Sequence, residues 1–505
     1  MFDQRRLKVV ADRPIRSDGQ YILYWMNANR RTRYNDALAR AIDWSIQLRK
    51  PLVVLEALSI DYPWASERHH QFILDGMVDQ YDAFGRADVA YYSYVERGPR
   101  EGRGLVAQLA AHASVLVTDY FPCFFLPSIV AHVGRSIGCR MEAIDANGVL
   151  PVNAAGKAFT SAYNFRRFMQ KSVISALEQA PEAAPLSRIP LQTAYTPHHE
   201  RLKRIGVSQD TLTRWAPSMN SSDRLRADRL LKGQLDASVG VLPIRGGQSA
   251  GLALSEKFRV HGLELYSERR NDPKHVVTSG LSPYLHFGHI SSSEVVHALL
   301  DTHGFNPESD TRNFKGQRSG FWELPEPVEA YLDQIITWRE LGYGFCHFVP
   351  DYHEYRTLPE WALRTLAEHT NDERPFIYTH DQFESGTTHD DLWNAAQNQL
   401  RREGKIHNYL RMLWGKKILH WSPTPQDALE TMIQLNNKYA LDGRNPNSYS
   451  GIFWTLGRFD RAWGPEREVF GKVRYMTSAS TAKKFSVSNY INTYARGAQT
   501  TLGLT

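Results

Sequence analysis

Five of the chain's twelve tryptophans fall within residues 390–463, a stretch that is also rich in Arg, Lys and Asn. These five are Trp393, Trp414, Trp421, Trp454 and Trp463. Trp414 and Trp421 are seven residues apart, so on one helix they share a face and lie about 10 Å apart along its axis. A single buried tryptophan is most often a packing residue whose indole N–H needs a partner. Because basic residues interleave with these indoles, core packing alone explains the group less well.

The segment TSGLSPYLHFG, residues 278–288, has the composition of a phosphate-binding turn. Hydroxyl groups of Thr278, Ser279 and Ser282 flank Gly280, just before an expected helix with Ser282 as N-cap and Pro283 as first residue. Free N–H groups and the positive end of the helix dipole favour a phosphate there. An ordinary capped helix start is the alternative, and a capping box from Ser291 to Glu294 is expected at the next helix.

Polar residues suited to a buried ligand follow in the same half of the chain. Asn408 and Arg411 stand one helical turn apart, and Asp442, followed by Gly443, offers a carboxylate with which Arg411 could pair. Asn436 lies inside an expected helix, where Asn has no propensity advantage, so a buried amide there needs a backbone or ligand partner. Motifs of dinucleotide-binding turns, P-loops, serine hydrolases, zinc proteases and kinases are missing, and no metal site is expected.

Composition sets broad limits on the protein. A chain of 505 residues is too long for one core, so two or three domains are expected. The net charge of +6 is a weak indication of a polyanionic partner, although the basic residues concentrate around the tryptophan-rich stretch. Three cysteines without a CxxC pair indicate a reducing compartment. Since neither a signal peptide nor a membrane span is evident, we expect a soluble, intracellular protein of the cytoplasm, nucleoid or nucleus.

The pattern of apolar residues divides the chain in two. Near-continuous apolar runs that predict strands occupy residues 21–25, 51–58, 89–95 and 114–119, and helical patterns separate them at 35–48, 67–84 and 102–112. This alternation predicts an α/β domain over residues 1–178, with a doubly wound parallel sheet that can bind a ligand at its strand ends. Residues 179–225 are proline-rich and predict a linker, and residues 226–505 predict an all-α domain.

Seven motifs together resemble the photolyase/cryptochrome family, and within it the class II cyclobutane pyrimidine dimer photolyases. In chain order they are YILYWMNANRR, TSGLSPYLHFGHIS, WRELGYGFC, HDDLWNAAQ, GKIHNYLRMLWGKKIL, LDGRNPNSYSGIFW and DRAWG. The helical half is similar almost throughout. The first half is similar more loosely, and YFPCFFLP, residues 120–127, departs from the family's pattern.

The resemblance implies non-covalently bound FAD in the helical domain. The residues implied for its phosphate side are Tyr266, Thr278, Ser279, Gly280, Leu281 and Ser282. The rest of the pocket would be lined by Arg339, Asn408, Arg411, Asp442 and Gly443, with Asn436 facing flavin N5. A catalytic row of tryptophans from the surface to the flavin would comprise Trp421, Trp393 and Trp414, the last being nearest the flavin. A second chromophore in the α/β domain, a deazaflavin or a folate, is left open, as is its absence.

The same resemblance implies light-dependent DNA repair by a deoxyribodipyrimidine photo-lyase, a carbon–carbon lyase driven by electron transfer from photoexcited FADH⁻. The partner would be UV-damaged double-stranded DNA with its pyrimidine dimer flipped out, bound by a monomer. Trp338, Met412 and Trp454 would line the lesion pocket, the indoles sandwiching the dimer, and Arg461 and Trp463 would fill the gap in the duplex. The class usually carries an acidic residue one turn before Trp338, where this chain has Gln334 beside Asp333.

Three other functions compete with dimer repair. A cryptochrome-like photosensor would keep the flavin and the tryptophans but signal to a protein; about thirty residues after KVRYMTS and retained lesion-pocket aromatics favour repair. A (6-4) photolyase needs a histidine acid in its lesion pocket, for which the sequence offers no convincing position. A flavin-binding protein with a structural role is the remaining alternative.

Overall fold

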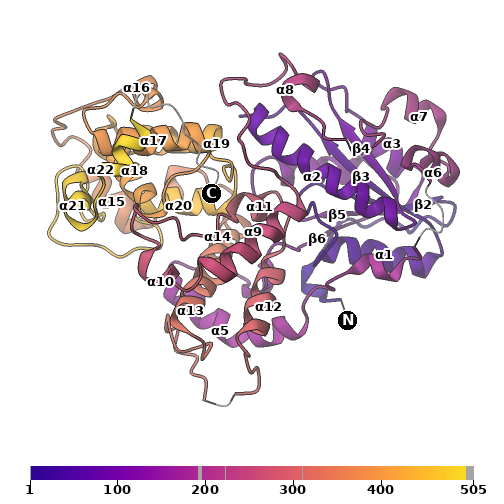
Figure 1. Ribbon diagram of the computed structural model, residues 1–505, viewed down its shortest axis with the longest axis horizontal. Helices are drawn as coiled ribbons and strands as arrows, with labels where there is room; N and C mark the ends of the chain where they lie inside the picture. The colour runs from indigo at the N-terminus through magenta and orange to yellow at the C-terminus, as the bar shows by residue number, and fades with distance from the viewer. Residues whose placement is uncertain (1, 192–195, 222, 310, 496–505) are drawn as a thin grey trace. The chain divides into compact units, whose positions relative to one another are not determined.

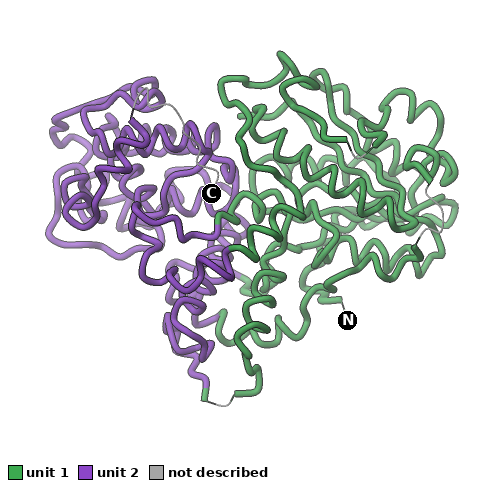
Figure 2. The backbone as a smooth tube through the Cα atoms, in the orientation of Figure 1, with its two compact units in different colours: residues 1–156, 169–257, 280–311 green, residues 157–168, 258–279, 312–505 purple. Residues whose placement is uncertain are grey.

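The computed structural model describes residues 2–191, 196–221, 223–309 and 311–495 (Figure 1). Two compact units make up the chain, and each combines stretches that are far apart in the sequence (Figure 2). Unit 1 comprises Met1–Gly156, Met169–Lys257 and Gly280–Thr311, and unit 2 comprises Lys157–Phe168, Phe258–Ser279 and Arg312–Thr505. The domain boundaries expected at residues 178 and 225 remain predictions, and residues 192–195 and 222 of the expected linker lie outside the described part of the chain.

Unit 1 is built on a six-stranded sheet with the strand order β1-β6-β5-β2-β3-β4. Its strands are β1 (Leu7–Ala11), β2 (Tyr21–Trp25), β3 (Leu52–Leu58), β4 (Ala90–Val95), β5 (Ala113–Asp119) and β6 (Arg140–Ile144). All neighbouring pairs are parallel except β1 with β6. The four predicted strands are confirmed within one residue at each end.

Strands β1 and β6 escaped prediction because neither has the continuous apolar run of a central parallel strand. In β1 four of five residues are at least partly exposed, including Lys8 and Val9. In β6 the buried carboxylate of Glu142 interrupts the apolar pattern. Arg40 and Arg140 each place a guanidinium nitrogen 2.8 Å from this carboxylate, which offsets the cost of burying it.

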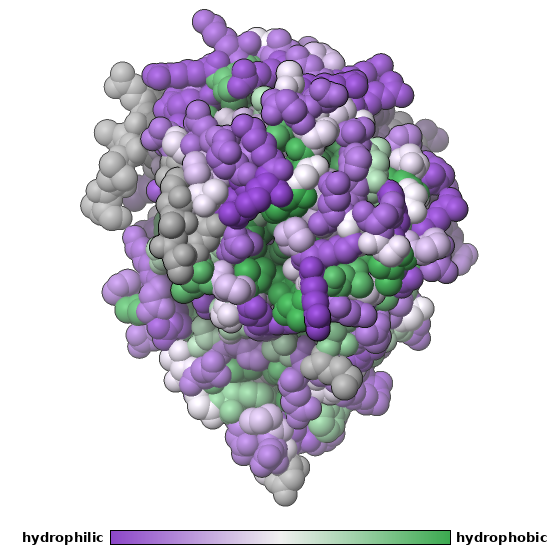
Figure 3. All heavy atoms as spheres, turned by 90° about the vertical axis from the view of Figure 1, so that its right-hand side faces the viewer, coloured by the Kyte–Doolittle hydropathy of each residue, from purple (hydrophilic) through white to green (hydrophobic). Residues whose placement is uncertain are grey.

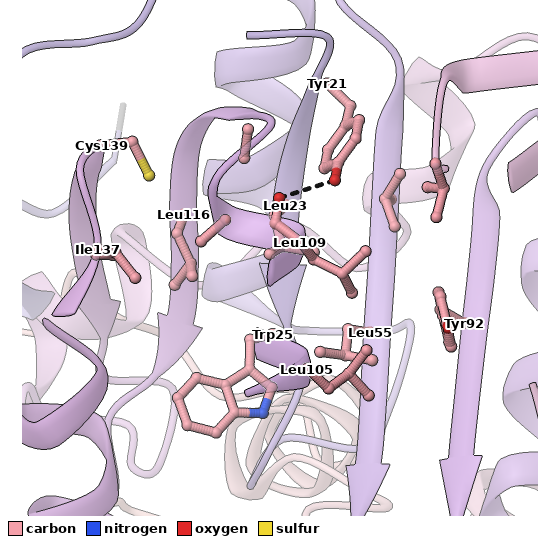
Figure 4. Close-up of a cluster of buried hydrophobic side chains, with 14 of the residues drawn as sticks. Tyr21, Leu23, Trp25, Leu55, Tyr92, Leu105, Leu109, Leu116, Ile137 and Cys139 are labelled. Carbon is pink, nitrogen blue, oxygen red and sulfur yellow. Dashed lines mark hydrogen bonds between the residues drawn. The ribbon is translucent and has the colours of Figure 1, made fainter. Parts of the chain in front are cut away.

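The core of the sheet explains the confirmed doubly wound architecture. All five residues of β2 are buried, so helices must cover both faces of this strand. Figure 4 shows one such core cluster, with Tyr21, Leu23 and Trp25 of β2 among side chains from β3, β5 and α3. The Tyr21 hydroxyl donates a hydrogen bond of 2.8 Å to the Leu109 carbonyl. The face in Figure 3 carries mostly hydrophilic residues, interrupted by a few hydrophobic ones.

Before residue 179 the described chain forms five α-helices, and the first three lie at the positions that the sequence predicts, 35–48, 67–84 and 102–112. They are α1 (Asp36–Leu48), α2 (Glu67–Arg86), α3 (Leu105–Ala110) and α4 (Leu126–Ser136), followed by α5 (Ala162–Glu178). Residues 179–225 hold two short helices that the proline-rich composition hid, α6 (His198–Ile205) and α7 (Gln209–Arg214). The helices that follow are α8 (Ala227–Leu230), α9 (Gln248–His261), α11 (Ser282–His286) and α12 (Ser292–Thr302).

Two expected helix caps differ from the prediction. Helix α11 has Leu281 at its N-cap position, so Ser282 is already the first helical residue. Ser291 does cap α12, but its side chain accepts from the Ser293 N–H, and no capping box forms. Glu294 is instead engaged by Arg33, whose Nε lies 2.6 Å from its carboxylate, because an ion pair outcompetes a neutral backbone donor.

The described residues of unit 2 form helices joined by loops, and no strand follows Ile144 in the described chain, as predicted for the second half. Its helices are α10 (Tyr266–Arg269), α13 (Glu326–Leu332), α14 (Arg339–Phe348), α15 (Glu360–Glu368), α16 (His380–Ser385), α17 (Asp391–Glu403), α18 (Asn408–Trp421), α19 (Pro425–Tyr439), α20 (Pro446–Thr455), α21 (Ser478–Lys484) and α22 (Ser488–Tyr494). A π-helical segment, Asp333–Trp338, joins α13 directly to α14. Among the described helices none has the length and apolarity of a membrane span.

Candidate functional site

The three expected row tryptophans lie together inside unit 2. Trp393 of α17 donates its indole N–H to the Trp414 carbonyl of α18 at 3.0 Å. The rings of Trp393 and Trp421 are 6.0 Å apart between centroids. Gln397 accepts the Trp414 indole N–H at 2.9 Å, a partner that sequence reasoning missed because it comes from another helix. The shared face expected for Trp414 and Trp421 is therefore part of a continuous buried group.

The outer end of this row differs from expectation. Trp421 was expected at the surface, yet it is only 1% exposed. The rings of Tyr378 and His389 cover it at centroid distances of 5.6 and 5.0 Å, and the Lys417 ammonium lies 4.9 Å from its ring centre. The segment before α17 folds back over the helix end, a tertiary contact without a local sequence signal.

Arg411, Asn436 and Asp442 form the polar centre of unit 2. Arg411 donates from Nη1 to the Asn436 side-chain oxygen at 3.2 Å, and its Nη2 lies 3.6 Å from the Asp442 carboxylate. The ion pair expected from the sequence is therefore present. Asn436 is 3% exposed, and its Nδ2 has no hydrogen-bond partner among the described residues. A buried donor left unpaired costs about 1–3 kcal/mol, which a ligand acceptor would offset.

Gly443 allows the turn after α19 to pack closely against the end of that helix. A Cβ at this position would lie 2.8 Å from the Asn436 carbonyl oxygen and 2.9 Å from that of Ala440. Any larger residue would push the turn after α19 away from the helix end. Asn408, the first residue of α18, donates to the Asn271 side chain at 3.2 Å. Arg339 donates to the Tyr343 hydroxyl at 3.1 Å and lies over its ring.

The expected phosphate-side residues are divided between the two units. Tyr266, Thr278 and Ser279 belong to unit 2, whereas Gly280, Leu281 and Ser282 belong to unit 1. Within unit 2, Tyr331 brings two of them together: its ring packs 5.2 Å from that of Tyr266, and its hydroxyl is hydrogen-bonded to Ser279. Burial raises the pKa of Tyr331 and keeps its hydroxyl neutral. In unit 1, Gly280 has φ +66°, a left-handed conformation that favours glycine. That all six residues together bind the phosphate side of FAD stays a prediction.

Trp338 and Trp454 form an apolar wall in the same unit. Their rings stack with centroids 5.0 Å apart and planes inclined by 28°. Two rings in mutual contact leave no space for a pyrimidine between them, so they present one combined surface rather than the expected sandwich. Both indoles are half-buried, as is Met412.

The π-helical segment that carries Trp338 also carries Gln334 and Asp333. Such segments insert an extra residue into a helical turn and are frequent at functional sites. Arg166 binds the Asp333 carboxylate with two nitrogens, at 2.8 and 3.1 Å, so this acid is already engaged. Gln334 is half-buried, and its amide makes no hydrogen bond to a described residue. The amide, not the neighbouring acid, is the available polar group beside Trp338.

Arg461 and Trp463 lie on the loop that follows α20. The Arg461 guanidinium is 4.6 Å from the Trp463 ring centre, and the Arg474 guanidinium is 5.0 Å from it. Asp460 accepts the Trp463 indole N–H at 3.1 Å and holds the ring in place. The loop therefore presents an exposed cation on an aromatic ring.

The ligand edge of the α/β sheet is closed by the chain's own rings. Strands β3 and β5 flank β2 and run parallel to it, so their following loops meet at one edge. There Tyr62 packs 5.1 Å from Phe125, and Trp64 stacks 5.9 Å from Phe124. No planar molecule fits between rings at these distances. The residues of this edge therefore do not fit a second chromophore held between them.

At the end of β5, the carboxylate of Asp119 is already engaged by groups of the chain. The Asp119 carboxylate at the end of β5 accepts from the backbone N–H groups of Asn27, Ala28 and Asn29 at 2.8–2.9 Å, and from the Tyr24 hydroxyl at 2.8 Å. An acid with four donors has little capacity left for a ligand.

Comparison with known proteins identifies relatives along nearly the whole chain, although no family model matches it. The deoxyribodipyrimidine photo-lyase of Methanothermobacter thermautotrophicus is 32% identical over 475 residues, which cover 94% of this chain and 94% of that protein. The protein of that name from Oryza sativa subsp. japonica is 33% identical, covering 94% of this chain and 87% of its own. That from Potorous tridactylus is 30% identical, covering 97% and 84%.

Among solved structures, a bacterial class III photolyase from Agrobacterium tumefaciens has the same fold. It matches with a TM-score of 0.63 and 16% sequence identity, over 94% of this chain and 86% of that one. The α/β sheet, the helical second half and the near-complete coverage of the named relatives agree with the resemblance carried by the sequence motifs. The chain belongs to the deoxyribodipyrimidine photo-lyase family.

Proposed function

We propose that this protein is a light-dependent DNA repair enzyme that splits cyclobutane pyrimidine dimers, with the site arrangement of a class II photolyase. The observation that carries the proposal is the buried Asn436 amide, whose oxygen is held by Arg411 while its N–H group has no partner among the described residues. A buried donor of this kind fits a heteroaromatic ligand with an acceptor nitrogen. The relatives named deoxyribodipyrimidine photo-lyase supply the reaction class.

FAD is the cofactor that these residues fit, and when reduced and bound it would supply a light-driven one-electron donor. Asn436 would donate a hydrogen bond to the flavin ring edge. Arg411, fixed by Asp442, would contribute positive charge beside it and favour an anionic ring. Asn408 and Arg339 would line the remaining pocket, and Tyr266 and Ser279 its phosphate side.

The wall of Trp338 and Trp454 is proposed to receive the dimer. A dimer inside a duplex cannot reach a buried cofactor, so it must leave the helix, and its poor stacking lowers the cost of flipping. The combined indole surface would contact its apolar ring faces. Gln334 would donate its free amide N–H to a pyrimidine carbonyl. On the DNA side, Arg461 and Trp463 would occupy the space that the dimer leaves.

The buried tryptophan row is proposed to restore the reduced cofactor after oxidation. Trp414 would give up an electron toward the cofactor and regain one from Trp393, which would regain one from Trp421. A reductant from solution would then return the electron that Trp421 has lost. Contact between these residues keeps each transfer short. Because the substrate is DNA, we place the protein inside the cell, and we propose that it acts as a monomer on damaged duplex DNA.

The test is blue-light repair of an oligonucleotide that carries one defined pyrimidine dimer. The purified protein should show a flavin absorption spectrum and restore the intact pyrimidines under light but not in the dark. Trp338→Ala is a matched variant, because it removes half of the wall while leaving Asn436, Arg411 and Asp442 in place; its repair yield should fall. A flavin spectrum without light-dependent repair would overturn the proposal and favour a photosensor.

A further inference from the structure

Lys416 is a buried lysine of α18 that contacts the end of α20. It is only 1% exposed. Its ammonium donates a hydrogen bond to the Thr455 carbonyl. Thr455 is the last residue of α20 and directly follows Trp454 of the apolar wall. The negative end of the α20 dipole makes this position favourable for a cation.

Close packing leaves this contact little freedom. A Cβ on Gly415 would lie 2.8 Å from the Thr455 methyl group and 3.0 Å from the Met432 sulfur, so the α18 backbone lies directly against α20. The Thr455 hydroxyl donates to the Ile452 carbonyl at 2.6 Å. Lys416 therefore provides the hydrogen-bond donor for the last carbonyl of α20. The closely packed backbone of α18 leaves this helix end little room to move.

Two charged residues that follow α20 in the chain, Asp460 and Arg474, influence the Lys416 ammonium. Burial lowers the pKa of Lys416 to about 7, the negative charge of Asp460 opposes this shift, and Arg474 adds to it. Asp460 accepts from the Trp463 indole at 3.1 Å and from the Arg461 N–H at 2.9 Å. Lys416 thus contacts Thr455, the residue next to Trp454, and its ammonium feels the charge of Asp460, the residue that holds Trp463.

The connecting turn is suited to transmit this restraint. Gly457 has φ +111°, and a Cβ there would lie 3.0 Å from Ala362 and from the Trp361 ring. Arg458 is buried with its guanidinium 4.2 Å from the Phe345 ring centre. Gly457 and Arg458 lie between Trp454 and Trp463, so close packing restrains the segment that links the two indoles.

We propose that Lys416 is a positioning residue for damaged DNA, which couples the wall indole Trp454 to the loop indole Trp463. The proposal rests on the proposed function, because it assigns these two indoles to the dimer and to the gap in the duplex. Lys416 itself does not contact the dimer. Its charge restrains the positions of the Trp454 and Trp463 rings. Rings that are already held in place bind damaged DNA without first losing conformational freedom.

Lys416→Met tests the proposal, because Met keeps much of the side-chain length but cannot donate or carry charge. The variant should bind dimer-containing duplex about tenfold more weakly, the loss expected when two aromatic side chains must first be ordered on binding. Affinity for undamaged duplex and flavin content should stay unchanged. Lys405→Met, which removes an exposed lysine paired with Glu403, controls for the loss of one positive charge. Lys416→Arg retains the cation and should keep part of the preference for damaged DNA.

The pH dependence of the wild-type protein is a second measurement that needs no variant. Damaged-DNA affinity relative to undamaged DNA should fall as pH rises through about 7, where Lys416 loses its proton. The charged groups that face it are Asp460 and Arg474. In Lys416→Met this fall should disappear.

Unchanged preference for damaged DNA in Lys416→Met, or an equal loss on undamaged DNA, would overturn the positioning role. So would a wild-type preference that is flat between pH 6 and 8.5. A wild-type protein with no preference for dimer-containing DNA would instead overturn the proposed function, and the role of Lys416 with it. The two failures are therefore distinguished by the wild-type measurement.

Discussion

Gln334 and Asp333 show how adjacent polar residues acquire different uses. Both lie in the π-helical segment before Trp338, but Arg166 neutralises the acid with two hydrogen bonds. The amide beside it remains free to meet a substrate. An amide can donate a hydrogen bond, yet it cannot transfer a proton at neutral pH.

Gln334→Glu should therefore raise the yield of dimer splitting, because a carboxylic acid can both donate a hydrogen bond and supply a proton to a pyrimidine carbonyl. Single-turnover repair by pre-reduced protein measures this yield directly. Gln334→Met keeps the side-chain length without a donor and should lower the yield. A yield for Gln334→Glu at or below that of the wild type would contradict the role of this position.

At the scale of elements, helices α17 and α18 position the tryptophan row. Their contact places the Trp393 indole against the Trp414 carbonyl, and Gln397 orients the Trp414 ring. The row is separate from the Trp338–Trp454 wall, which α20 and the π-helical segment carry. Cofactor reduction and dimer splitting should therefore be separable by mutation.

Trp414→Phe should block photoreduction of oxidised FAD while sparing repair by pre-reduced protein. Phenylalanine preserves the packing but is much harder to oxidise, so the first transfer in the row fails. Blue-light bleaching of the oxidised flavin band measures the first activity, and repair after chemical reduction measures the second. Normal photoreduction in this variant would show that another residue is the first donor.

At the scale of the whole molecule, buried ionisable groups make stability depend on pH. Glu56 of β3 is 1% exposed, with its carboxylate 3.2 Å from the Arg30 Nε and 2.7 Å from the Tyr91 hydroxyl. Burial outweighs these partners and raises the pKa of Glu56 to about 7. Its contribution to stability is fully present below the unfolded pKa, about 4.5, and is lost as pH rises through about 7.

Glu56→Gln should remove this dependence. As pH rises from 5 to 8, the free energy of unfolding of the wild type should fall relative to that of the variant. Urea unfolding of both proteins across this range provides the measurement, and comparing differences cancels the contributions of all other groups. A difference that stays constant with pH would mean that Glu56 titrates alike in the folded and unfolded chains.

The sequence by itself determined the central strands, most helices and the family of this protein. Buried parallel strands such as β2 and β3 need continuous apolar runs, and those runs are visible without a structure. The edge strand β1 and the charged β6 were missed because their stability comes from partners that the sequence places elsewhere. Pairing of Arg411 with Asp442 was predictable, since only one helix separates them.

Tertiary structure alone decided how the functional side chains meet. Stacking of Trp338 on Trp454, the covering of Trp421 by Tyr378, and closure of the sheet edge by Trp64 and Phe124 all join residues from separate elements. The burial of Lys416 against Thr455 is of the same kind. Local periodicity reports which face of an element is apolar, but the partner on that face is set by packing, where distant residues compete for the same volume.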